Sequence, residues 1–269
     1  MDVFLEEYSS EDAIRKYSSQ TAGYGISYLL ANDYAKVYLN AVDHLLKIDL
    51  HRPMKLLEFG CGAGMNLITL FRLLEEKGRR VDLAIGTDFS ERLVGAANSE
   101  AERLLSKSQR EKIRFGIARN EELKSDLAAV LKTSPKQLRN SFHLILGVNT
   151  FRYCHRLGKE LTCARAIADL LAPGGVCIMI DMNRRFPAFR SRFRRTTETR
   201  EERYLPTLGQ YAAPFTKAGL ELLRKENFCW IPHSASPALT TICRLSAPVL
   251  NVMAKPFAMR SLVVVRKAG

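Results

Sequence analysis

The stretch Leu56-Leu57-Glu58-Phe59-Gly60-Cys61-Gly62-Ala63-Gly64 decides the fold that this sequence predicts. It begins within an apolar run of strand type, 54–60, and leads into an amphipathic helical pattern that Gly78 closes. Glycines at alternate positions lack a Cβ atom, so the turn can adopt positive φ angles and let a ligand approach the backbone. The free N–H groups at the start of the following helix point toward the same place. We therefore expect a ligand site where a strand turns into a helix.

The sequence on either side of this turn alternates between short apolar runs and longer amphipathic stretches. We expect strands at 81–88, 112–118, 142–149 and 176–181, and helices at 31–48, 65–78, 91–106, 121–132 and 159–172. Strands that alternate with helices imply right-handed crossovers and a parallel sheet, so the fold class is α/β. The rhythm breaks after residue 181. There we expect a helix at 214–226, a strand at 227–233, a loop-rich apolar stretch at 234–259 and a last strand at 260–267.

Composition excludes several classes of protein. Apolar residues make up 46% of the chain and charged residues 26%, which are ordinary globular values and exclude a disordered chain. No run of about 18 apolar residues is present, which argues against a membrane span. The N-terminus is acidic and lacks the apolar core of a signal peptide, and the six cysteines form no CxxC pair. We therefore expect a cytoplasmic protein with free thiols.

The formal net charge of +13 is unevenly distributed. Residues 1–135 carry 19 basic and 20 acidic side chains, whereas residues 136–269 carry 22 basic and 8 acidic ones. Eight arginines lie between 184 and 203, partly interleaved with phenylalanines. This Arg-rich segment leaves three interpretations open: a solvated amphipathic helix, a contact for an anionic small molecule, and a contact for nucleic acid through phosphates and stacked bases.

The chemistry of the glycine-rich turn narrows its ligand. The spacing is G-x-G-x-G, which is neither the dinucleotide fingerprint nor the phosphate loop. Glu58 stands two residues before the first glycine, and a carboxylate there repels phosphate but attracts a cation. Asp88, at the end of the next strand, can accept both hydroxyl groups of a ribose. The pattern favours a ligand that combines a positive charge with a ribose.

These motifs resemble those of the class I S-adenosylmethionine-dependent methyltransferases of small-molecule type. LLEFGCGAG is similar to the first motif of that family, GTDFS to the second, and LLAPGGVCIMID to the turn and fifth strand. The resemblance covers about 53–182. It implies a seven-stranded Rossmann-like sheet in the order 3-2-1-4-5-7-6 with an antiparallel last strand. We interpret 1–269 as one domain, with a helical lid at 1–52, a cofactor-binding core at 53–182, and an acceptor-site region with the closing strands at 183–269.

The resemblance also implies a set of cofactor-binding residues for S-adenosylmethionine and its product S-adenosylhomocysteine. Glu58 and the backbone of the turn would hold the methionine part, Asp88 the ribose, and Phe89 the adenine. Arg119 stands where the family often has an aspartate, so Asn120 or Glu121 is expected at the adenine edge, although Asn120 serves equally well as a helix cap. The full expected set is Glu58, Gly60, Cys61, Gly62, Gly64, Asp88, Phe89, Asn120, Glu121 and Asn149.

Residues beyond the cofactor core are candidates for the reaction itself. His155 is a candidate general base because it titrates near neutrality, and the alternative is a surface histidine. A sulfonium is a good leaving group, so positioning can suffice without a base. Candidate substrate or lid residues are Tyr17, Tyr24, Tyr28, Tyr153 and Arg184, and the tyrosines near the N-terminus serve equally well as core packing.

A metal is not expected. Asp181 and Asn183 follow the fifth strand, where some O-methyltransferases hold Mg²⁺, but Asn149 stands where a further carboxylate would be needed. The expected function is methyl transfer to a small-molecule acceptor that is anionic or partly apolar. The alternatives are an RNA methyltransferase that uses the Arg-rich segment, although nucleic acid is not the favoured partner, and an inactive cofactor-binding scaffold. A homo-oligomer is compatible with each of these three functions.

Overall fold

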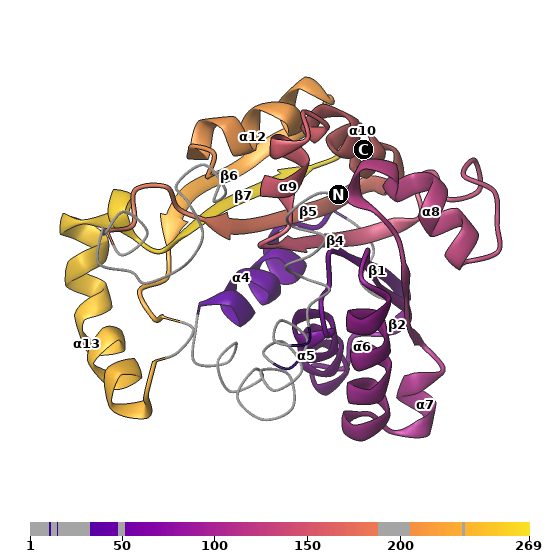
Figure 1. Ribbon diagram of the computed structural model, residues 1–269, viewed down its shortest axis with the longest axis horizontal. Helices are drawn as coiled ribbons and strands as arrows, with labels where there is room; N and C mark the ends of the chain where they lie inside the picture. The colour runs from indigo at the N-terminus through magenta and orange to yellow at the C-terminus, as the bar shows by residue number, and fades with distance from the viewer. Residues whose placement is uncertain (1–10, 12–14, 16–32, 48–51, 188–204, 233–234) are drawn as a thin grey trace.

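A seven-stranded sheet covered by helices on both faces forms the body of the protein (Figure 1). The computed structural model describes residues 11, 15, 33–47, 52–187, 205–232 and 235–269. The strands are β1 Met54–Phe59, β2 Val81–Asp88, β3 Ile113–Ile117, β4 Phe142–Val148, β5 Leu171–Met182, β6 Glu221–Phe228 and β7 Arg260–Arg266. The α-helices are α4 Tyr34–Asn40, α5 Met65–Glu76, α6 Glu91–Leu104, α7 Lys107–Arg110, α8 Leu123–Val130, α9 Phe151–Arg156, α10 Glu160–Leu170, α12 Leu208–Lys217 and α13 Pro237–Met253. The shorter elements are η2 Ala41–Leu45, η3 Asn120–Glu122 and η4 Lys255–Phe257.

The strand order confirms the predicted topology. The sheet runs β3-β2-β1-β4-β5-β7-β6, and β7 is antiparallel to both of its neighbours. The carboxyl ends of β1, β2 and β4 lie at one edge, because Glu58 pairs with Gly86 on one side and Leu146 on the other. Since β7 runs in the opposite direction, its first residue lies at this same edge, where Arg260 pairs with Met182. The edge therefore collects the strand ends that an open α/β sheet uses to bind ligands.

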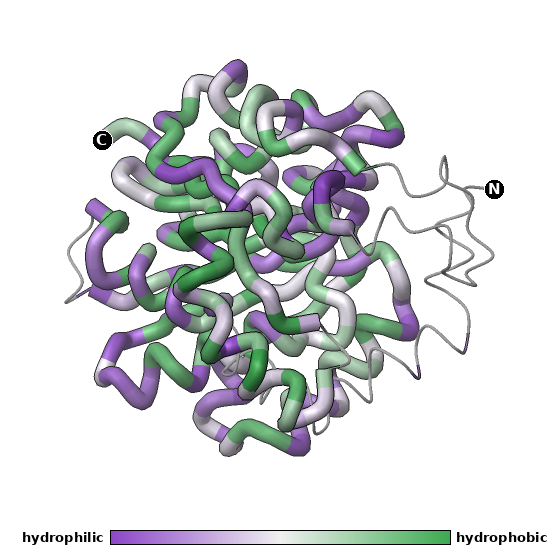
Figure 2. The backbone as a smooth tube through the Cα atoms, turned by 90° about the vertical axis from the view of Figure 1, so that its left-hand side faces the viewer, coloured by the Kyte–Doolittle hydropathy of each residue, from purple (hydrophilic) through white to green (hydrophobic). Residues whose placement is uncertain are grey.

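Two hydrophobic clusters, one on each face, hold the helices to the sheet. One cluster joins α4, η2 and α5 to alternate residues of the central strands. The other joins α8, α9, α10 and α12 to the intervening residues of the same strands. Figure 2 shows hydrophobic segments through the middle of the molecule and hydrophilic ones mostly around them. Burial on both faces explains why β4 and β5 are apolar almost throughout.

The helical lid predicted at 1–52 is described only in part. Residues 33–47 form α4 and the π-helical turn η2, and they are packed into the core, with Tyr34 and Tyr38 fully buried. Tyr17, Tyr24 and Tyr28 lie outside the described residues. The lid over the ligand site therefore stays a prediction, while the described part of this region belongs to the body of the domain.

Three expected elements in the last third of the chain are wrong. The helix expected at 214–226 is divided: α12 begins earlier, at a capping box of Thr207 and Gln210, and ends before Gly219, whose φ is +85°. The following residues form β6 rather than a helix, so the strand expected at 227–233 begins at Glu221 and ends at Phe228. The leucines in this stretch fit both the helical and the strand periodicity, and the stretch forms a strand because it pairs with β7.

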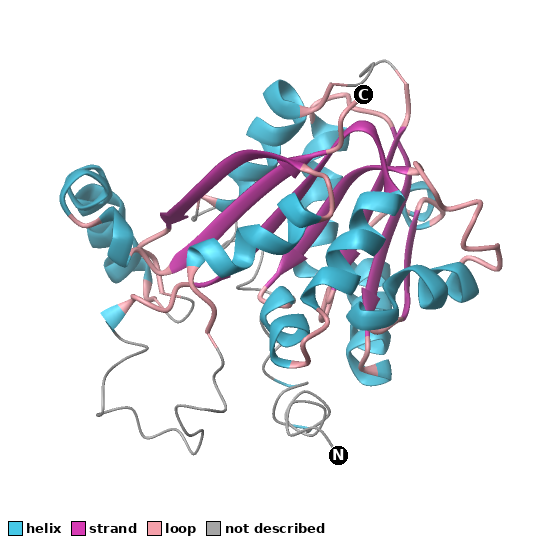
Figure 3. Cartoon of the chain, turned by 90° about the horizontal axis from the view of Figure 1, so that it is seen from above, coloured by secondary structure: helices cyan, strands magenta, loops and turns pink. Residues whose placement is uncertain are grey.

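The stretch 234–259, expected to be loop-rich, contains the 17-residue helix α13. Ser236 caps it and Pro237 occupies its first turn, where proline is favoured, while Pro248 lies in its interior and obscures the helical pattern. The helix lies at one end of the molecule in both side and top views (Figures 1 and 3). Its apolar face is exposed rather than buried: Val252 is 86% exposed and Leu245 77%.

Candidate active site

The turn between β1 and α5 has the predicted backbone geometry. Gly60, Gly62 and Gly64 have φ angles of +64°, +53° and +81°, which side chains with a Cβ rarely adopt. A Cβ at Gly60 would lie 2.0 Å from the Oγ1 atom of Thr150, so this glycine lets the turn pack against the residue that follows β4. A Cβ at Gly62 would meet no protein atom within 4 Å. The middle of the turn therefore borders open space that a ligand can enter.

The carboxyl group of Glu58 is fully buried and fastens α5 to β1. Its Oε1 atom accepts a hydrogen bond of 3.0 Å from the Asn66 amide, and its Oε2 atom accepts one of 3.0 Å from the backbone N–H of Leu67. Burial raises the pKa of Glu58 to about 8, against the opposing effect of these two hydrogen bonds. Glu58 thus organises the turn from beneath.

The same network reaches the N-terminal part of the domain. The Tyr38 hydroxyl donates a hydrogen bond of 3.0 Å to Oδ1 of Asn66, whose amide nitrogen donates to Glu58. All three side chains are buried. The chain of hydrogen bonds links α4, α5 and β1, so the region predicted as a lid contributes a side chain to the support of the glycine turn. Sequence analysis gave no signal for this role of Tyr38, which reads as a core aromatic residue.

Asp88 holds the other side of the turn. Its Oδ2 atom accepts a hydrogen bond of 2.9 Å from the backbone N–H of Gly62, and its Oδ1 atom accepts one of 3.0 Å from the N–H of Ser90. Burial raises the pKa of Asp88, and the backbone hydrogen bonds oppose the shift. A carboxylate has about four acceptor positions, and the backbone N–H groups of Gly62, Ser90 and Phe89 occupy three of them, so one remains for a hydroxyl group of a ligand. Phe89, half-buried, follows directly.

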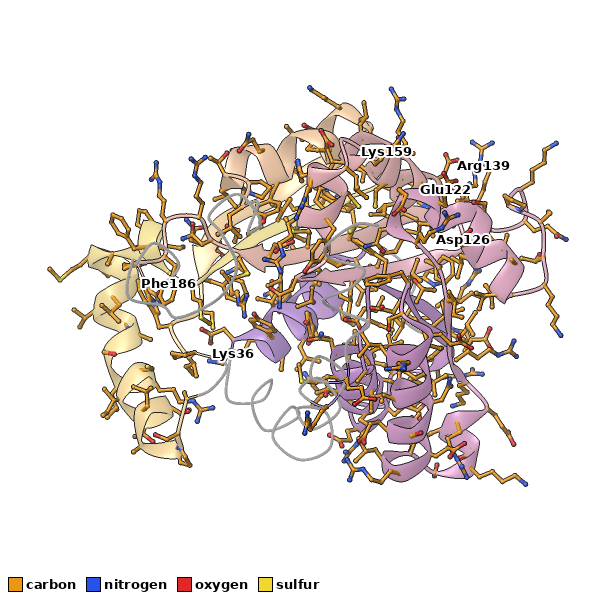
Figure 4. All side chains as sticks on the ribbon, viewed as in Figure 1. Lys36, Glu122, Asp126, Arg139, Lys159 and Phe186 are labelled. Carbon is orange, nitrogen blue, oxygen red and sulfur yellow. The ribbon has the colours of Figure 1, made fainter. Side chains whose placement is uncertain are left out.

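Asn120, which we predicted at the adenine edge, contacts a residue that sequence analysis did not select. Its amide donates a hydrogen bond of 2.6 Å to Oγ1 of Thr150, the buried residue that packs against Gly60. Glu121 is half-buried on the same short helix, η3. Arg119, at the position where the family often has an aspartate, pairs with Asp126 of α8. Asp126 is labelled toward the right of Figure 4. Arg119 is exposed.

The ends of β4, β5 and β7 form a cluster of charged side chains next to the turn. Asn149 has a φ of +56°, and its Oδ1 atom accepts a hydrogen bond of 2.7 Å from Arg260. Asp181, fully buried, accepts from the backbone N–H groups of Arg152 and Met182. Burial raises the pKa of Asp181, although Arg152, these N–H groups and Arg260 oppose the shift. Asn149, which directly follows β4, is thus held by the buried guanidinium group of Arg260.

Arg152 links the buried Asp181 to the half-buried Tyr153. Its guanidinium group donates a hydrogen bond of 2.7 Å to the Tyr153 hydroxyl and lies 4.8 Å from the centre of that ring. Tyr153 is half-buried. The predicted substrate residue Tyr153 is therefore positioned by an arginine that sequence analysis did not select. Arg184 follows β5 at the same edge and is exposed.

The expectation of a metal-free site stays a prediction. Within the described ranges, no three His, Cys, Asp or Glu side chains gather in a metal-binding arrangement. Two arginines accompany Asp181, and the Asn183 amide donates to the carbonyl oxygens of Pro256 and Ala258. This positive surrounding is unfavourable for a divalent cation.

His155 lies on helix α9 among aromatic rings. Its ring meets Phe151 and Tyr211 edge to face, with centroid distances of 5.1 and 5.6 Å. Burial lowers the pKa of His155, and the nearby Glu160 opposes the shift. These contacts favour a packing role over either the catalytic role or the exposed loop position considered from the sequence. The catalytic role stays a prediction.

All six cysteines are free thiols, as expected, and five of them are buried. Cys61, in the turn, points its sulfur toward the carbonyl of Gly62, and burial raises its thiol pKa well above the ordinary value. Its backbone N–H donates to the carbonyl of Thr87 in β2. Cys61 therefore contributes backbone geometry to the turn.

Among the described residues, no helix is long and apolar enough to cross a bilayer.

The fold and the glycine-rich turn define the class I Rossmann-like methyltransferases that depend on S-adenosylmethionine. The chain matches the family model described as a methyltransferase domain over residues 50–219, more than half its length, and it belongs to that family. It is thus a methyltransferase whose family uses S-adenosylmethionine and yields S-adenosylhomocysteine. No curated protein matches the chain in sequence.

Solved structures share this fold at low sequence identity. The CMeT domain of citrinin polyketide synthase is 17% identical, with a TM-score of 0.61, over 97% of this chain and 58% of that one. A SAM-dependent methyltransferase from Aquifex aeolicus is 14% identical, with a TM-score of 0.56, over 94% and 97%. A chain of a Haloferax volcanii complex between the Trm112 methyltransferase activator and a putative methyltransferase is 14% identical, with a TM-score of 0.54, over 91% and 93%.

The two glycines Gly60 and Gly78 provide a matched test of the turn. Both have positive φ, but a Cβ at Gly78 meets no atom within 4 Å. We expect Gly78→Ala to lower the free energy of unfolding by about 1 kcal/mol, from backbone strain alone. Gly60→Ala adds the collision with Thr150 and should cost about 3 kcal/mol or more. Urea unfolding measures both, and equal losses would contradict the packing of Gly60 on Thr150.

The raised pKa of Glu58 predicts a pH dependence of stability. The folded protein holds a proton on Glu58 from about pH 4.5 to about pH 8, whereas the unfolded chain does not. This contribution to stability is complete below pH 4.5 and is lost as the pH rises through 8, by up to about 1.4 kcal/mol per pH unit. Glu58→Gln removes the titration. Relative to this variant, the wild-type protein should therefore lose free energy of unfolding from pH 5 to pH 8.

Urea unfolding of both proteins at pH 5, 6.5 and 8 measures this difference. The lost acceptor atom in Glu58→Gln changes stability by a constant amount, so only the slope of the difference with pH is diagnostic. If the free energies of unfolding of the two proteins differ by the same amount at all three pH values, Glu58 keeps an ordinary pKa in the folded protein.

Proposed function

We propose that the protein transfers the sulfonium methyl group of S-adenosylmethionine to a small-molecule acceptor that carries an anionic group and is partly apolar. One observation carries the proposal. The glycine turn, Asp88 and the Asn149–Arg260 pair all lie at one edge of the sheet, the first two on one side and the pair on the other. A cofactor site and a cationic acceptor site are thereby adjacent.

The residues of the turn fit the cofactor. Gly62 borders open space, and Asp88 retains acceptor capacity for a ribose hydroxyl. The buried carboxyl group of Glu58 fixes the start of α5, so that the backbone of the turn is held in place for the methionine part of the cofactor. In this proposal Phe89 packs on the adenine, and Asn120, with Glu121, contacts its edge. The backbone of Gly60, Cys61 and Gly64 shapes the turn, and Asn149 lies next to the reacting group.

In this proposal, methyl transfer requires little acid–base catalysis by the protein. The cofactor supplies an activated methyl group on a good leaving group, so the contribution of this chain is to hold the acceptor atom in line and to exclude water. Tyr153, fixed by Arg152, and the cation of Arg260 are the groups that we propose orient the acceptor. His155 packs between aromatic rings and is not required in this scheme.

Two alternatives remain distinct from this proposal. Most of the Arg-rich segment that an RNA methyltransferase would use, 188–203, lies outside the described residues. An inactive scaffold would bind cofactor without transferring methyl groups. The cytoplasmic location and a homo-oligomer stay predictions, and a protein partner is a further possibility, since one of the similar structures is a complex with an activator.

Asp88→Asn tests the cofactor site. We expect the affinity for S-adenosylhomocysteine, measured by calorimetry, to fall at least tenfold, because an amide accepts hydroxyl hydrogen bonds less well than a carboxylate. Asp82→Asn, on the exposed side of the same strand, is the matched control and should bind as the wild type does. A 2′-deoxy analogue should bind the wild type more weakly but lose little further affinity in Asp88→Asn. Full affinity in Asp88→Asn would contradict the assignment.

Transfer of a labelled methyl group tests the function. Protein and methyl-labelled S-adenosylmethionine are incubated with a cell extract that has been separated into small-molecule, RNA and protein fractions. We expect label in a small-molecule product, loss of this label with Asp88→Asn, and labelling within about twofold of wild type with His155→Phe, which keeps the ring contacts. Label in RNA would favour the first alternative, and cofactor binding without any label would favour the scaffold. A hundredfold loss in His155→Phe with full cofactor affinity would restore His155 as the base.

A further inference from the structure

A cavity of about 460 Å³ opens between the end of β5, the start of α12 and β6. Its wall includes Arg184 and Arg185, which follow β5, and Lys225 of β6. No carboxylate is among the described residues that line it. The glycine turn and Asp88 are not part of it. The cavity is therefore separate from the proposed cofactor site and belongs to the cationic half of the molecule.

The three cations of the cavity have no countercharge within the described part of the chain. Every acidic partner in the ion pairs of that part pairs with some other basic residue. On β6 the neighbours of Lys225 show the contrast, because Arg224 and Lys255 both pair with Glu226. Three like charges around one cavity repel one another, and an anion in the cavity would relieve this repulsion.

Buried amides give the cavity a fixed wall. The Asn183 side chain donates to the carbonyls of Pro256 and Ala258, and its oxygen accepts the backbone N–H of Arg185 at 2.9 Å. Asn227 donates to the same Pro256 carbonyl and accepts from the Ser261 hydroxyl. Arg185 is thus anchored through its backbone, while its exposed side chain stays available. A wall held in place before binding reduces the entropy lost when a ligand is bound.

The shape of the cavity favours a compact ligand group over a nucleic-acid strand. A volume of about 460 Å³ lies within the range of small-molecule sites, whereas single-stranded nucleic acid is bound along extended grooves with stacked aromatic rings. None of the described lining residues is aromatic. Three cations match a group with two negative charges better than a single carboxylate, and arginine and lysine are the usual ligands of phosphoryl oxygens.

The position of the cavity sets a distance to the reacting methyl group. Asn149 follows β4, and the cavity lies across β5 and β7 toward β6. Neighbouring strands are about 4.8 Å apart, so two to three strand spacings separate the two places, roughly 10–15 Å. An acceptor anchored in the cavity can reach the methyl group only if its anionic group lies about that far from the methylated atom.

We propose that this cavity binds a phosphoryl group of the acceptor and so selects phosphorylated small molecules as substrates. The inference rests on the proposed function, since it names the acceptor class of the same enzyme. Arg185 and Lys225 hold the phosphoryl oxygens, and Arg184 adds to the positive potential of the cavity wall. The cations serve recognition and take no part in the transfer of the methyl group.

Calorimetry with pyrophosphate as the probe tests the cavity at constant ionic strength. We expect the wild-type protein to bind pyrophosphate, and the double variant Arg185→Gln with Lys225→Gln to bind it at least tenfold more weakly. Lys217→Gln, which removes an exposed cation from the other end of α12, is the matched control and should leave the affinity unchanged. Equal affinity in the double variant and the wild type would overturn the inference. So would a short single-stranded RNA that binds more tightly than pyrophosphate and depends on the same two residues.

The charge of the labelled product shows whether the methylated small molecule itself carries a phosphoryl group. Treatment with a phosphatase should change the charge of the methylated small molecule, and a product that resists the phosphatase would overturn the claim about the acceptor even if pyrophosphate binds. Titration with S-adenosylhomocysteine keeps the two proposals apart. If the double variant binds it as the wild type does, loss of pyrophosphate affinity reports on the cavity alone, whereas failure of the wild type to bind it counts against the proposed function.

Discussion

The buried carboxyl group of Glu58 is the constraint on which the rest of the site depends. It lies in β1, and both of its oxygens accept hydrogen bonds from the first turn of α5. The glycine turn is thereby closed from below by Glu58 and from the side by Asp88. Because Asn66 also binds Tyr38, the position of α4 depends on the same carboxyl group. A buried network that joins side chains of β1, α5 and α4 specifies one arrangement of those elements, since its members would be left unsatisfied in any other.

The direction of one strand explains why the two halves of the site differ in charge. Six strands run parallel and end at one edge, which places the turn, Asp88 and Asn149 together. The antiparallel β7 instead begins there and delivers Arg260 to Asn149. Part of the excess of basic residues in the second half of the chain therefore lies on this side of the sheet. Arg152 at the start of α9, Arg260 at the start of β7 and the cations of the cavity lie away from Asp88 and the middle of the glycine turn.

Sequence analysis predicted the strands of the first two thirds of the chain and the glycine turn because periodic apolar strands and a glycine motif are local signals, and the resemblance to a known family supplied the sheet order. It failed where the structure depends on contacts distant in sequence. The stretch after Gly219 has leucines that fit a helix, and only pairing with β7 makes it a strand. Pro248 concealed α13. Thr150 and Tyr38 carry no motif, and their roles follow from contacts with Gly60 and Asn66. The positions of Tyr17, Tyr24 and Tyr28 lie outside the described residues, so the lid is untested.

The place of β7 in the sheet also has a consequence for how the chain folds. β6 makes its strand pairing to β7 alone, and the two are separated in sequence by residues 229–259, which include α13. When β6 has been synthesised it has no edge to join, because the strand that connects it to β5 follows it. The parallel strands and their crossovers can form first, with β5 as a temporary open edge. Closure of this half of the sheet then requires a non-local pairing, a step that loop-closure entropy makes slow. The side of the sheet that contains β6 and β7 is therefore assembled last, on parallel strands that are already formed.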